Sequence, residues 1–254
     1  HDRLKDLKAD RRKVDFGGQL RMRYHREDNL RNSAAVPNSR GLTGADDDFL
    51  LYRTRLWVNA TVNKRVRAYF ELLDAESTLE DLAPRASDVD RLDIHQAYID
   101  LAINERLQLR IGRQAIDIGS RRLLGLGEWA NIRRSFDGLQ ASLAGEQFDF
   151  DAYYLQPLSI QPHDFNRTNH DISVYGINSH QHVDEETILD YYWLALELDT
   201  SGARYDTLGV YWKGERNNLL YEVEGGVQVD TNFDDTDHQA GFATVGLGTN
   251  LQGR

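Results

Sequence analysis

The chain has 254 residues, of which 40% are hydrophobic and 28% charged, and its formal net charge is −11. No stretch holds the roughly 18 consecutive apolar residues that a membrane-spanning helix needs. The absence of Cys excludes disulfides, thiol catalysis and cysteine-ligated zinc. The acidic balance argues against non-specific nucleic-acid binding. A mean hydropathy of −0.61, with 12 Tyr but only 4 Pro, is typical of a β protein whose strands are half buried.

The first residues, HDRLKDLKADRRK, differ in pattern from the rest of the chain. Leu4 and Leu7 lie three residues apart among charged residues, which fits either a short amphipathic helix or a mobile terminus. We therefore divide the chain into an N-terminal arm, residues 1–13, and one β domain, residues 14–254.

From Val14 onward the dominant hydrophobic period is two. Leu20 and Met22 alternate with Arg21 and Arg23, and a similar run over 50–62 is long enough to cross a bilayer at a tilt. This pattern predicts about eleven strands bounded by turn residues. They cover 14–25, 50–62, 66–72, 96–101, 107–118, 139–143, 148–154, 190–199, 205–214, 219–230 and 238–248.

The predicted connections fall into two classes. Tight hairpins at NKR, INER, GEQ and TSGA alternate with long loops at 29–48, 76–91, 119–135 and 156–187. The alternation ends at ERNN (215–218), a short link where a long one is due. Short turns at one end and long loops at the other are typical of transmembrane β-barrels.

The two faces of the strands also differ. One face is apolar and has aromatic residues near strand ends, which resembles the aromatic girdle of a membrane barrel. The other face is rich in Arg and carries Trp57 and Tyr69, which suits a crowded lumen. We predict an all-β, antiparallel up-and-down transmembrane β-barrel; a soluble β-sandwich or lectin-like sheet is the alternative. The girdle residues are Tyr24, Tyr52, Tyr154, Tyr192 and Trp212.

The stretch LQLRIGRQAIDIGS (107–120) interrupts its own alternation at Gly112. A β-bulge there would shift the register by one, so that Arg113 and Asp117 join Arg110 on the inner face. Ile116 and Ile118 would then face lipid. Alternatively, Arg113 lies near the rim and extends its charge to the headgroups.

The segments LRIGRQAIDIGSRRLLG and EWANIRRSFDG resemble the alginate-export family of bacterial outer-membrane proteins, as do HQAYIDL and YEVEGGVQ. The resemblance spans most of 14–230. It implies a barrel of about eighteen strands in the outer membrane, inserted by the barrel-assembly machinery. It also implies an arginine-lined lumen that attracts a polyanion, with Arg113 and Gln114 in the matching GRQ motif. The odd strand count and the end at TNLQGR, which is not an aromatic-ended strand, lead us to expect part of a larger barrel.

The predicted inner-face charges are polarised. Opposed basic and acidic walls would set a transverse field across a pore, and Arg suits carboxylates through bidentate pairing. We therefore expect a channel that passes an anionic polysaccharide or a small organic anion by diffusion, narrowed by inward-folded loops. Alternatively, the arginines and acids pair with one another and fill the lumen, as in a structural barrel with a plugged lumen; a soluble carbohydrate-binding sheet is another alternative. The basic path comprises Arg21, Arg23, Arg53, Arg55, Arg67, Arg110 and Arg113, with Glu71, Asp100, Gln114 and Asp117; the acidic wall comprises Asp149, Asp151, Glu197, Glu222, Glu224 and Asp230.

Nothing in the sequence marks an enzyme, a cofactor site or a metal site. His163, His180 and His182 are expected in the 156–187 loop without the spacing of a helical metal motif. The acidic runs at 46–48 and 234–237 could bind Ca²⁺, but we interpret them as solvated loops. No nucleophile is accompanied by a base.

Overall fold

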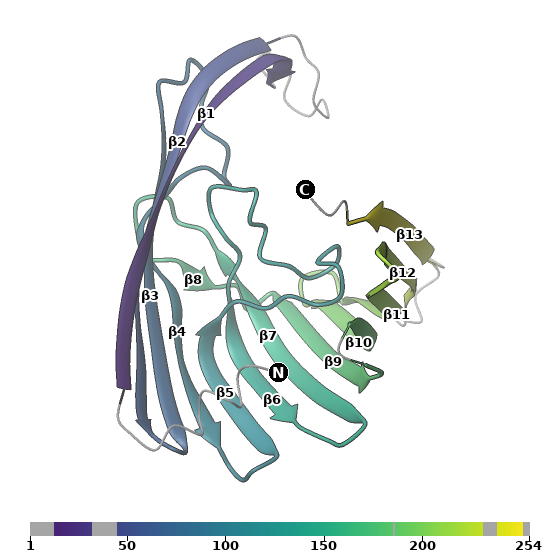
Figure 1. Ribbon diagram of the computed structural model, residues 1–254. Helices are drawn as coiled ribbons and strands as arrows, with labels where there is room; N and C mark the ends of the chain where they lie inside the picture. The colour runs from purple at the N-terminus through teal and green to yellow at the C-terminus, as the bar shows by residue number, and fades with distance from the viewer. Residues whose placement is uncertain (1–12, 32–44, 185, 231–237, 251–254) are drawn as a thin grey trace.

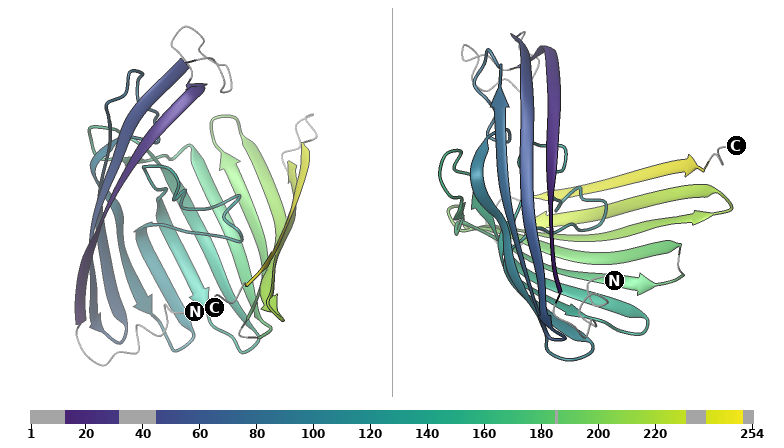
Figure 2. Two further views of the ribbon diagram at one scale, coloured as in Figure 1. Left: turned by 45° about the horizontal axis from the view of Figure 1, so that its top comes forward. Right: turned by 60° about the vertical axis from the view of Figure 1, so that its left-hand side comes forward.

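The computed structural model describes residues 13–31, 45–184, 186–230 and 238–250, and they form one antiparallel sheet with its connections (Figure 1). The sheet has 13 strands; each long strand pairs with the next long strand along the chain, and the two-residue β8 pairs only with β7. The sheet curls into a trough with a concave and a convex face (Figure 2). The predicted all-β, up-and-down antiparallel topology is confirmed. Among the described residues, β1 and β13 do not pair with each other.

The strands are long at one edge of the sheet and shorter in its middle. The bounds are β1 Lys13–Arg31, β2 Ala45–Asn63, β3 Val66–Thr78, β4 Asp90–Ala102, β5 Leu107–Gln114, β6 Phe136–Leu143, β7 Phe148–Ser159, β8 Arg167–Thr168, β9 Ile172–His182, β10 Thr187–Leu198, β11 Ala203–Arg216, β12 Leu219–Asp230 and β13 Gln239–Thr249. Residues 1–12 of the predicted arm lie outside the described residues. The acidic run at 234–237 also lies outside them.

The predicted count of about eleven strands is wrong, because the predicted loop 156–187 contains β8 and β9. Polar and small residues occupy both faces of β9, so its alternation carries little hydrophobic contrast. His180 and His182 therefore lie on a strand and not on a loop. The additional strand places the link at 217–218 at the short-turn end of the sheet, but it moves the predicted hairpin at 199–202 to the long-loop end, so short and long links do not alternate strictly.

Side chains of the long strands alternate between the two faces of the trough. In β2, Leu56 on the convex face is 57% exposed, whereas Arg53 on the concave face is 1% exposed. Other convex side chains follow the same pattern in neighbouring strands. A water-soluble sheet buries its apolar face and exposes its polar one, and this sheet does the reverse. The exposed convex side chains include Phe16, Leu20, Phe70, Ile99, Ile111, Leu139, Ile177, Leu208, Val210 and Val227.

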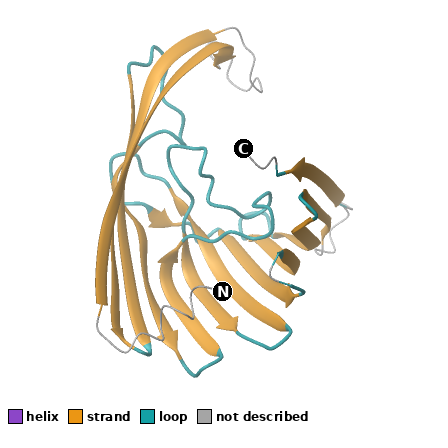
Figure 3. Ribbon diagram, in the orientation of Figure 1, coloured by secondary structure: helices purple, strands orange, loops and turns teal. Residues whose placement is uncertain are grey.

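The connection between β5 and β6, residues 115–135, folds into the concave side of the trough, and we call it the inward loop (Figure 3). Ile116 and Ile118, which we expected to face lipid, are each 4% exposed and pack in an apolar cluster with Tyr153 and Leu155 of β7. That prediction is wrong because β5 ends at Gln114, so the strand alternation does not extend to these residues.

The predicted β-bulge at Gly112 is also wrong. β5 pairs with β4 and with β6 through Gly112 without a register shift. Gly112 instead has a φ of 122°, and a Cβ there would lie 2.3 Å from the carbonyl oxygen of Ala97. A glycine is therefore required at this position, because the backbone of β4 lies too close to leave room for a Cβ. Because the register is continuous, Arg110 and Arg113 alternate to opposite faces of the strand.

Two further side chains differ from their predicted places. Tyr192, predicted in the aromatic girdle, is 4% exposed and packs in the concave apolar cluster. Glu197, predicted in the acidic wall, alternates to the convex face of β10, where Arg204 Nη1 lies 2.9 Å from it. Both predictions placed a residue correctly in a strand but assigned it to the wrong face.

Candidate functional site

The concave face of β2 to β4 is centred on Glu71, whose side chain is fully buried. Arg55 binds it in a bidentate manner, with Nε–Oε1 and Nη2–Oε2 distances of 2.6 and 3.1 Å. The Tyr69 hydroxyl and the Gln96 amide donate to the same carboxylate at 2.7 and 3.1 Å. The charge of Arg55 is thus compensated within the wall.

A second buried carboxylate, Asp100 of β4, compensates two more of the predicted path residues. Arg110 donates to it through Nε and Nη2 at 2.7 and 2.9 Å, and Arg67 donates at 3.2 Å. The Arg110 guanidinium also lies 3.8 Å from the ring centroid of Tyr98. Bidentate pairs of this kind fix both side chains in place.

Arg113 and Gln114 occupy the long-loop end of β5. Arg113 binds Asp137 at 3.0 and 3.2 Å and Asp93 at 3.4 Å, and it also donates to the carbonyl of Asn166 at 3.2 Å. Arg113 therefore holds the segment that crosses this end of the sheet. The prediction that Arg113 faces inward beside Arg110 is wrong, because no bulge shifts the register. Gln114 is fully buried, on the face that Arg110 shares.

The inward loop is anchored to β1 and β2 at one side of the trough. Arg21 donates to the carbonyls of Glu128 and Ala130, each at 2.7 Å, and Arg23 donates to the Trp129 carbonyl at 2.6 Å. Arg53 donates to the Glu128 carboxylate at 3.2 Å. These three predicted path residues therefore position a loop.

Glu128 lies between the loop and the wall. Burial raises the pKa of Glu128, but the charges of Arg133 and Arg53 outweigh it and hold the pKa below its ordinary value. Arg133 Nε lies 2.5 Å from the Glu128 carboxylate. The carboxylate thus neutralises cations from two parts of the chain.

The loop reaches the opposite side of the trough at β12 and β13. Ser120 donates to Glu224 through its hydroxyl, and the Tyr192 hydroxyl donates to Glu224 at 3.0 Å. Arg122 donates to the Thr244 hydroxyl at 3.0 Å. Glu224, predicted in the acidic wall, is 1% exposed and acts as the second anchor of the loop.

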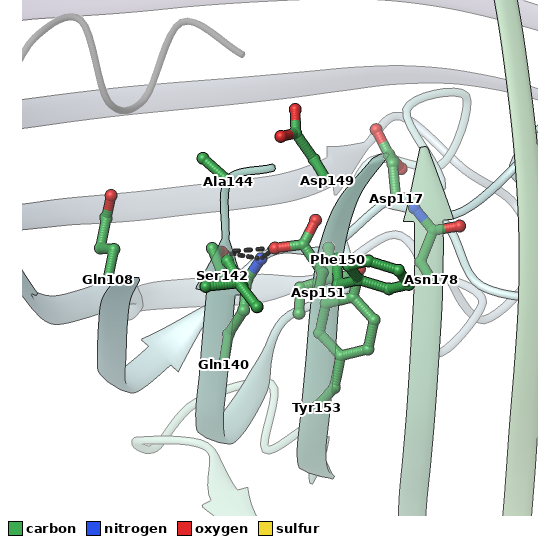
Figure 4. A pocket seen from close by; sticks show the side chains of 12 residues that line it. Gln108, Asp117, Gln140, Ser142, Ala144, Asp149, Phe150, Asp151, Tyr153 and Asn178 are labelled. Atoms are coloured by element: carbon green, nitrogen blue, oxygen red, sulfur yellow. Dashed lines mark hydrogen bonds between the residues drawn. The ribbon is translucent and has the colours of Figure 1, made fainter. Parts of the chain in front are cut away.

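The remaining predicted residues lie apart from these anchors. Asp117 sits on the inward loop, where it accepts a bond from the Leu126 amide at 2.9 Å and pairs with Arg121 at 3.1 Å. Asp149 and Asp151 of β7 line a cavity of about 240 Å³ on the concave side (Figure 4). Glu222 shares the concave face of β12 with Glu224.

Sequence reasoning missed the loop residues that build the anchors. Fully buried Asn131 donates through Nδ2 to the carbonyls of Tyr52, Glu76 and Asp88 at 3.0, 3.2 and 2.9 Å. Glu128, Arg133 and Ser120 were also missed. EWANIRRS (128–135) is rich in charged and amide residues, but a solvated loop is too, so no local signal distinguished these residues.

Among the described residues there is no helix that could cross a membrane. In the same part of the chain, no group of three or more His, Asp or Glu side chains is arranged to hold a metal ion. His163 lies in the 160–166 link. His180 Nδ1 lies 2.6 Å from an Asp190 carboxylate oxygen, and His182 Nε2 lies 2.8 Å from one of Asp149.

Comparisons with solved structures agree on the fold. The chain is similar to OccK2 (OpdF) of Pseudomonas aeruginosa in complex with glucuronate, at 13% identity and a TM-score of 0.59, covering 94% of this chain and 61% of that one. It is also similar to OccAB4 of Acinetobacter baumannii, at 10% identity and a TM-score of 0.60, covering 94% of this chain and 64% of that one. The chain thus spans less than two thirds of the length of these proteins. No curated protein matches it by sequence.

The family model for alginate export matches residues 12–254. The match covers the whole sheet and the inward loop, and it agrees with the apolar convex face, which suits contact with lipid. The chain therefore belongs to the alginate export family of bacterial outer-membrane β-barrel channels.

Proposed function

We propose that this chain forms the wall and constriction of an outer-membrane channel that passes an anionic polysaccharide or a small organic anion. The inward loop carries the proposal, because it crosses the concave face from Arg21 and Arg53 to Glu224. A loop anchored at both sides narrows the space that a solute can use. Passage past it is diffusion, with no covalent step.

Selection of anions would depend on arginines that are not held in ion pairs with buried carboxylates of the strands. Arg55, Arg67 and Arg110 form ion pairs with buried carboxylates. This pairing favours the alternative in which these three side chains fill the lumen and do not attract a solute. On the inward loop, Arg121 pairs with Asp117 at 3.1 Å and Arg122 Nε lies 3.9 Å from Glu224, but their side chains remain 63% and 54% exposed to a passing solute. We therefore assign anion attraction chiefly to the loop and not to a continuous ladder along the strands.

Two similarities support a uronate as the solute. The family model is that of alginate export, and OccK2, with which the chain shares its fold, was crystallised with glucuronate. A guanidinium matches the planar carboxylate of a uronate in a bidentate way. At this low identity the likeness of OccK2 supports the fold, and its ligand supplies only a candidate solute.

The test is the reversal potential of the full-length protein in a planar bilayer under a salt gradient, with and without an alginate oligomer. We expect anion preference, partial block by the oligomer, and loss of both in a double variant, Arg121→Gln with Arg122→Gln. The matched control is Arg106→Gln, on a short turn, which removes an exposed arginine without altering the loop. Equal selectivity in the wild type and the double variant would overturn the proposal, and absence of conductance would indicate a plugged structural barrel.

A further inference from the structure

A second feature of the concave face lies outside the anion path, between β5, β6, β7, β9 and the inward loop (Figure 4). The cavity has a volume of about 240 Å³ and is lined mainly by polar side chains. Ligand pockets commonly measure about 300–1,000 Å³, so this one suits a single small solute and not a polymer segment. It is also much larger than the roughly 30 Å³ that one water molecule occupies in the liquid.

The carboxylate of Asp151 lies at the centre of the cavity wall. Gln140 donates to its Oδ1 at 2.8 Å, and the Ser142 hydroxyl donates to the same oxygen. Both partners are neutral. Among the described residues, Oδ2 accepts no hydrogen bond and no cation forms an ion pair with Asp151.

Two further carboxylates line the same cavity, and each lies close to a basic side chain. Asp117 pairs with Arg121 at 3.1 Å, and Asp149 pairs with His182 at 2.8 Å. Among the described residues, Asp151 forms no such pair with Arg or His, and the Arg110 guanidinium, which is bound to Asp100, acts on it only at longer range. A neutral solute would leave this charge unmatched.

Buried acceptors provide an independent observation. Gln108 is 3% exposed and lines the cavity, and its Oε1 has no hydrogen-bond partner. The Oδ1 atom of Asn178, on the other side of the cavity, is also buried and without a partner. Buried acceptors without a partner are uncommon in folded proteins, so two of them on side chains that line one cavity point to a ligand that donates hydrogen bonds.

We propose that this cavity binds the ammonium group of a small polar solute, such as an amino sugar. An ammonium ion carries three donors and one positive charge, and this set matches Gln108, Asn178 and Asp151. A bare metal ion fits less well, because no three carboxylate or imidazole groups among the described residues approach closely enough to ligate one. The site would hold the cationic end of a solute beside the inward loop, whose Asp117 lines the same cavity.

This inference goes beyond the proposed anion channel and uses different residues. The two can fail separately, since anion preference depends on Arg121 and Arg122, whereas ammonium binding depends on Gln108 and Asp151. A solute that carries both charges would be oriented by the two sites together.

The test is isothermal titration of the folded full-length protein in detergent with glucosamine, at a mildly acidic pH where the amine is protonated and carboxylates stay charged. Glucose, which has the same ring and no amine, is the control ligand. We expect glucosamine to bind at least about tenfold more tightly than glucose, because a charged hydrogen bond is worth about 1.5–3 kcal/mol. Asp151→Asn should lower the glucosamine affinity by about tenfold or more, and Glu222→Gln, an equal charge change on the same face, should leave it unchanged.

Gln108→Leu separates a binding role from a structural one. It removes an acceptor that the fold leaves unsatisfied, so the melting temperature should stay the same or rise while glucosamine affinity falls. Equal affinity for glucose and glucosamine, or glucosamine binding unaffected by Asp151→Asn, would overturn the proposal. Absence of glucosamine binding alongside intact anion preference would overturn this site and leave the channel proposal standing.

Discussion

Glu224 on β12 and Ser120 on the inward loop are joined by a hydrogen bond across 104 residues of sequence. The carboxylate is 1% exposed and also accepts the Tyr192 hydroxyl at 3.0 Å. This single carboxylate ties the loop to the wall opposite Arg21 and Arg53. The width of the space beside the loop depends on it.

Glu224→Gln should release the far end of the inward loop. The substitution keeps the size of the side chain but replaces one acceptor oxygen by a donor group that faces the donors on Ser120 and Tyr192. We expect a loss of about 1–3 kcal/mol in unfolding free energy, faster proteolysis within 115–135, and larger single-channel conductance. Glu222→Gln, two residues earlier on the same face, is the control and should change none of these measurements.

Arg55→Ala should destabilise the fold far more than loss of a surface arginine does. It leaves the fully buried Glu71 without its bidentate partner, and breaking a buried pair in this way typically costs about 3–5 kcal/mol. Denaturant unfolding of the detergent-folded protein would measure the loss. The double variant Arg55→Met with Glu71→Gln should recover most of it, because the neutral amide oxygen can still accept from Tyr69 and Gln96. A double variant as unstable as Arg55→Ala would contradict the assignment.

Gly112→Ala and Gly127→Ala test the reason for the glycine in β5. Both glycines have positive φ, 122° and 65°, but a Cβ at Gly112 would lie 2.3 Å from the Ala97 carbonyl oxygen, whereas a Cβ at Gly127 would meet nothing within 4 Å. We expect Gly127→Ala to cost about 1–2 kcal/mol and Gly112→Ala to cost clearly more or to prevent folding. Similar thermal stability for the two variants would mean that the β4–β5 approach is looser than described.

Leu56→Arg should impair membrane insertion. Leu56 is 57% exposed on the convex face, and an arginine facing lipid costs about 2–4 kcal/mol near the bilayer midplane. Heat-modifiable migration on a gel after folding into vesicles would report insertion. Asn59→Asp places a charge on the concave face beside Arg67, whose Nε lies 2.7 Å from the Asn59 side chain, and this control should insert normally.

Acid should loosen the near end of the inward loop. The pKa of Glu128 is lower in the folded protein than its ordinary value of about 4.3, so its stabilising contribution is fully present above that ordinary value. The contribution is lost as the pH falls through the lowered, folded-state pKa. Proteolysis of the loop by an acid-active protease should therefore increase only at the acidic end of a series from neutral pH downward. In Glu128→Gln this increase in proteolysis at acidic pH should be absent.

The sequence by itself determined the strands and their faces wherever one face was clearly apolar. In β2, Arg53 and Leu56 alternate so regularly that a one-residue shift would expose charge to lipid, which makes the register unambiguous. The same contrast predicted the convex and concave faces of β3 and β12, and those of β5 as far as Ile111. Where contrast is absent, as in β9 with His180 and Asn178, sequence reasoning missed the strand.

Only the tertiary structure decided what the concave side contains. The direction of the inward loop depends on where β5 ends, and from that end follow the burial of Ile116 and Ile118 and the anchors at Arg21 and Glu224. Those contacts join residues about a hundred positions apart, and no local period encodes such pairs. The arginine pattern was therefore visible in the sequence, but the partner of each arginine was set by the packing of the strands and the loop.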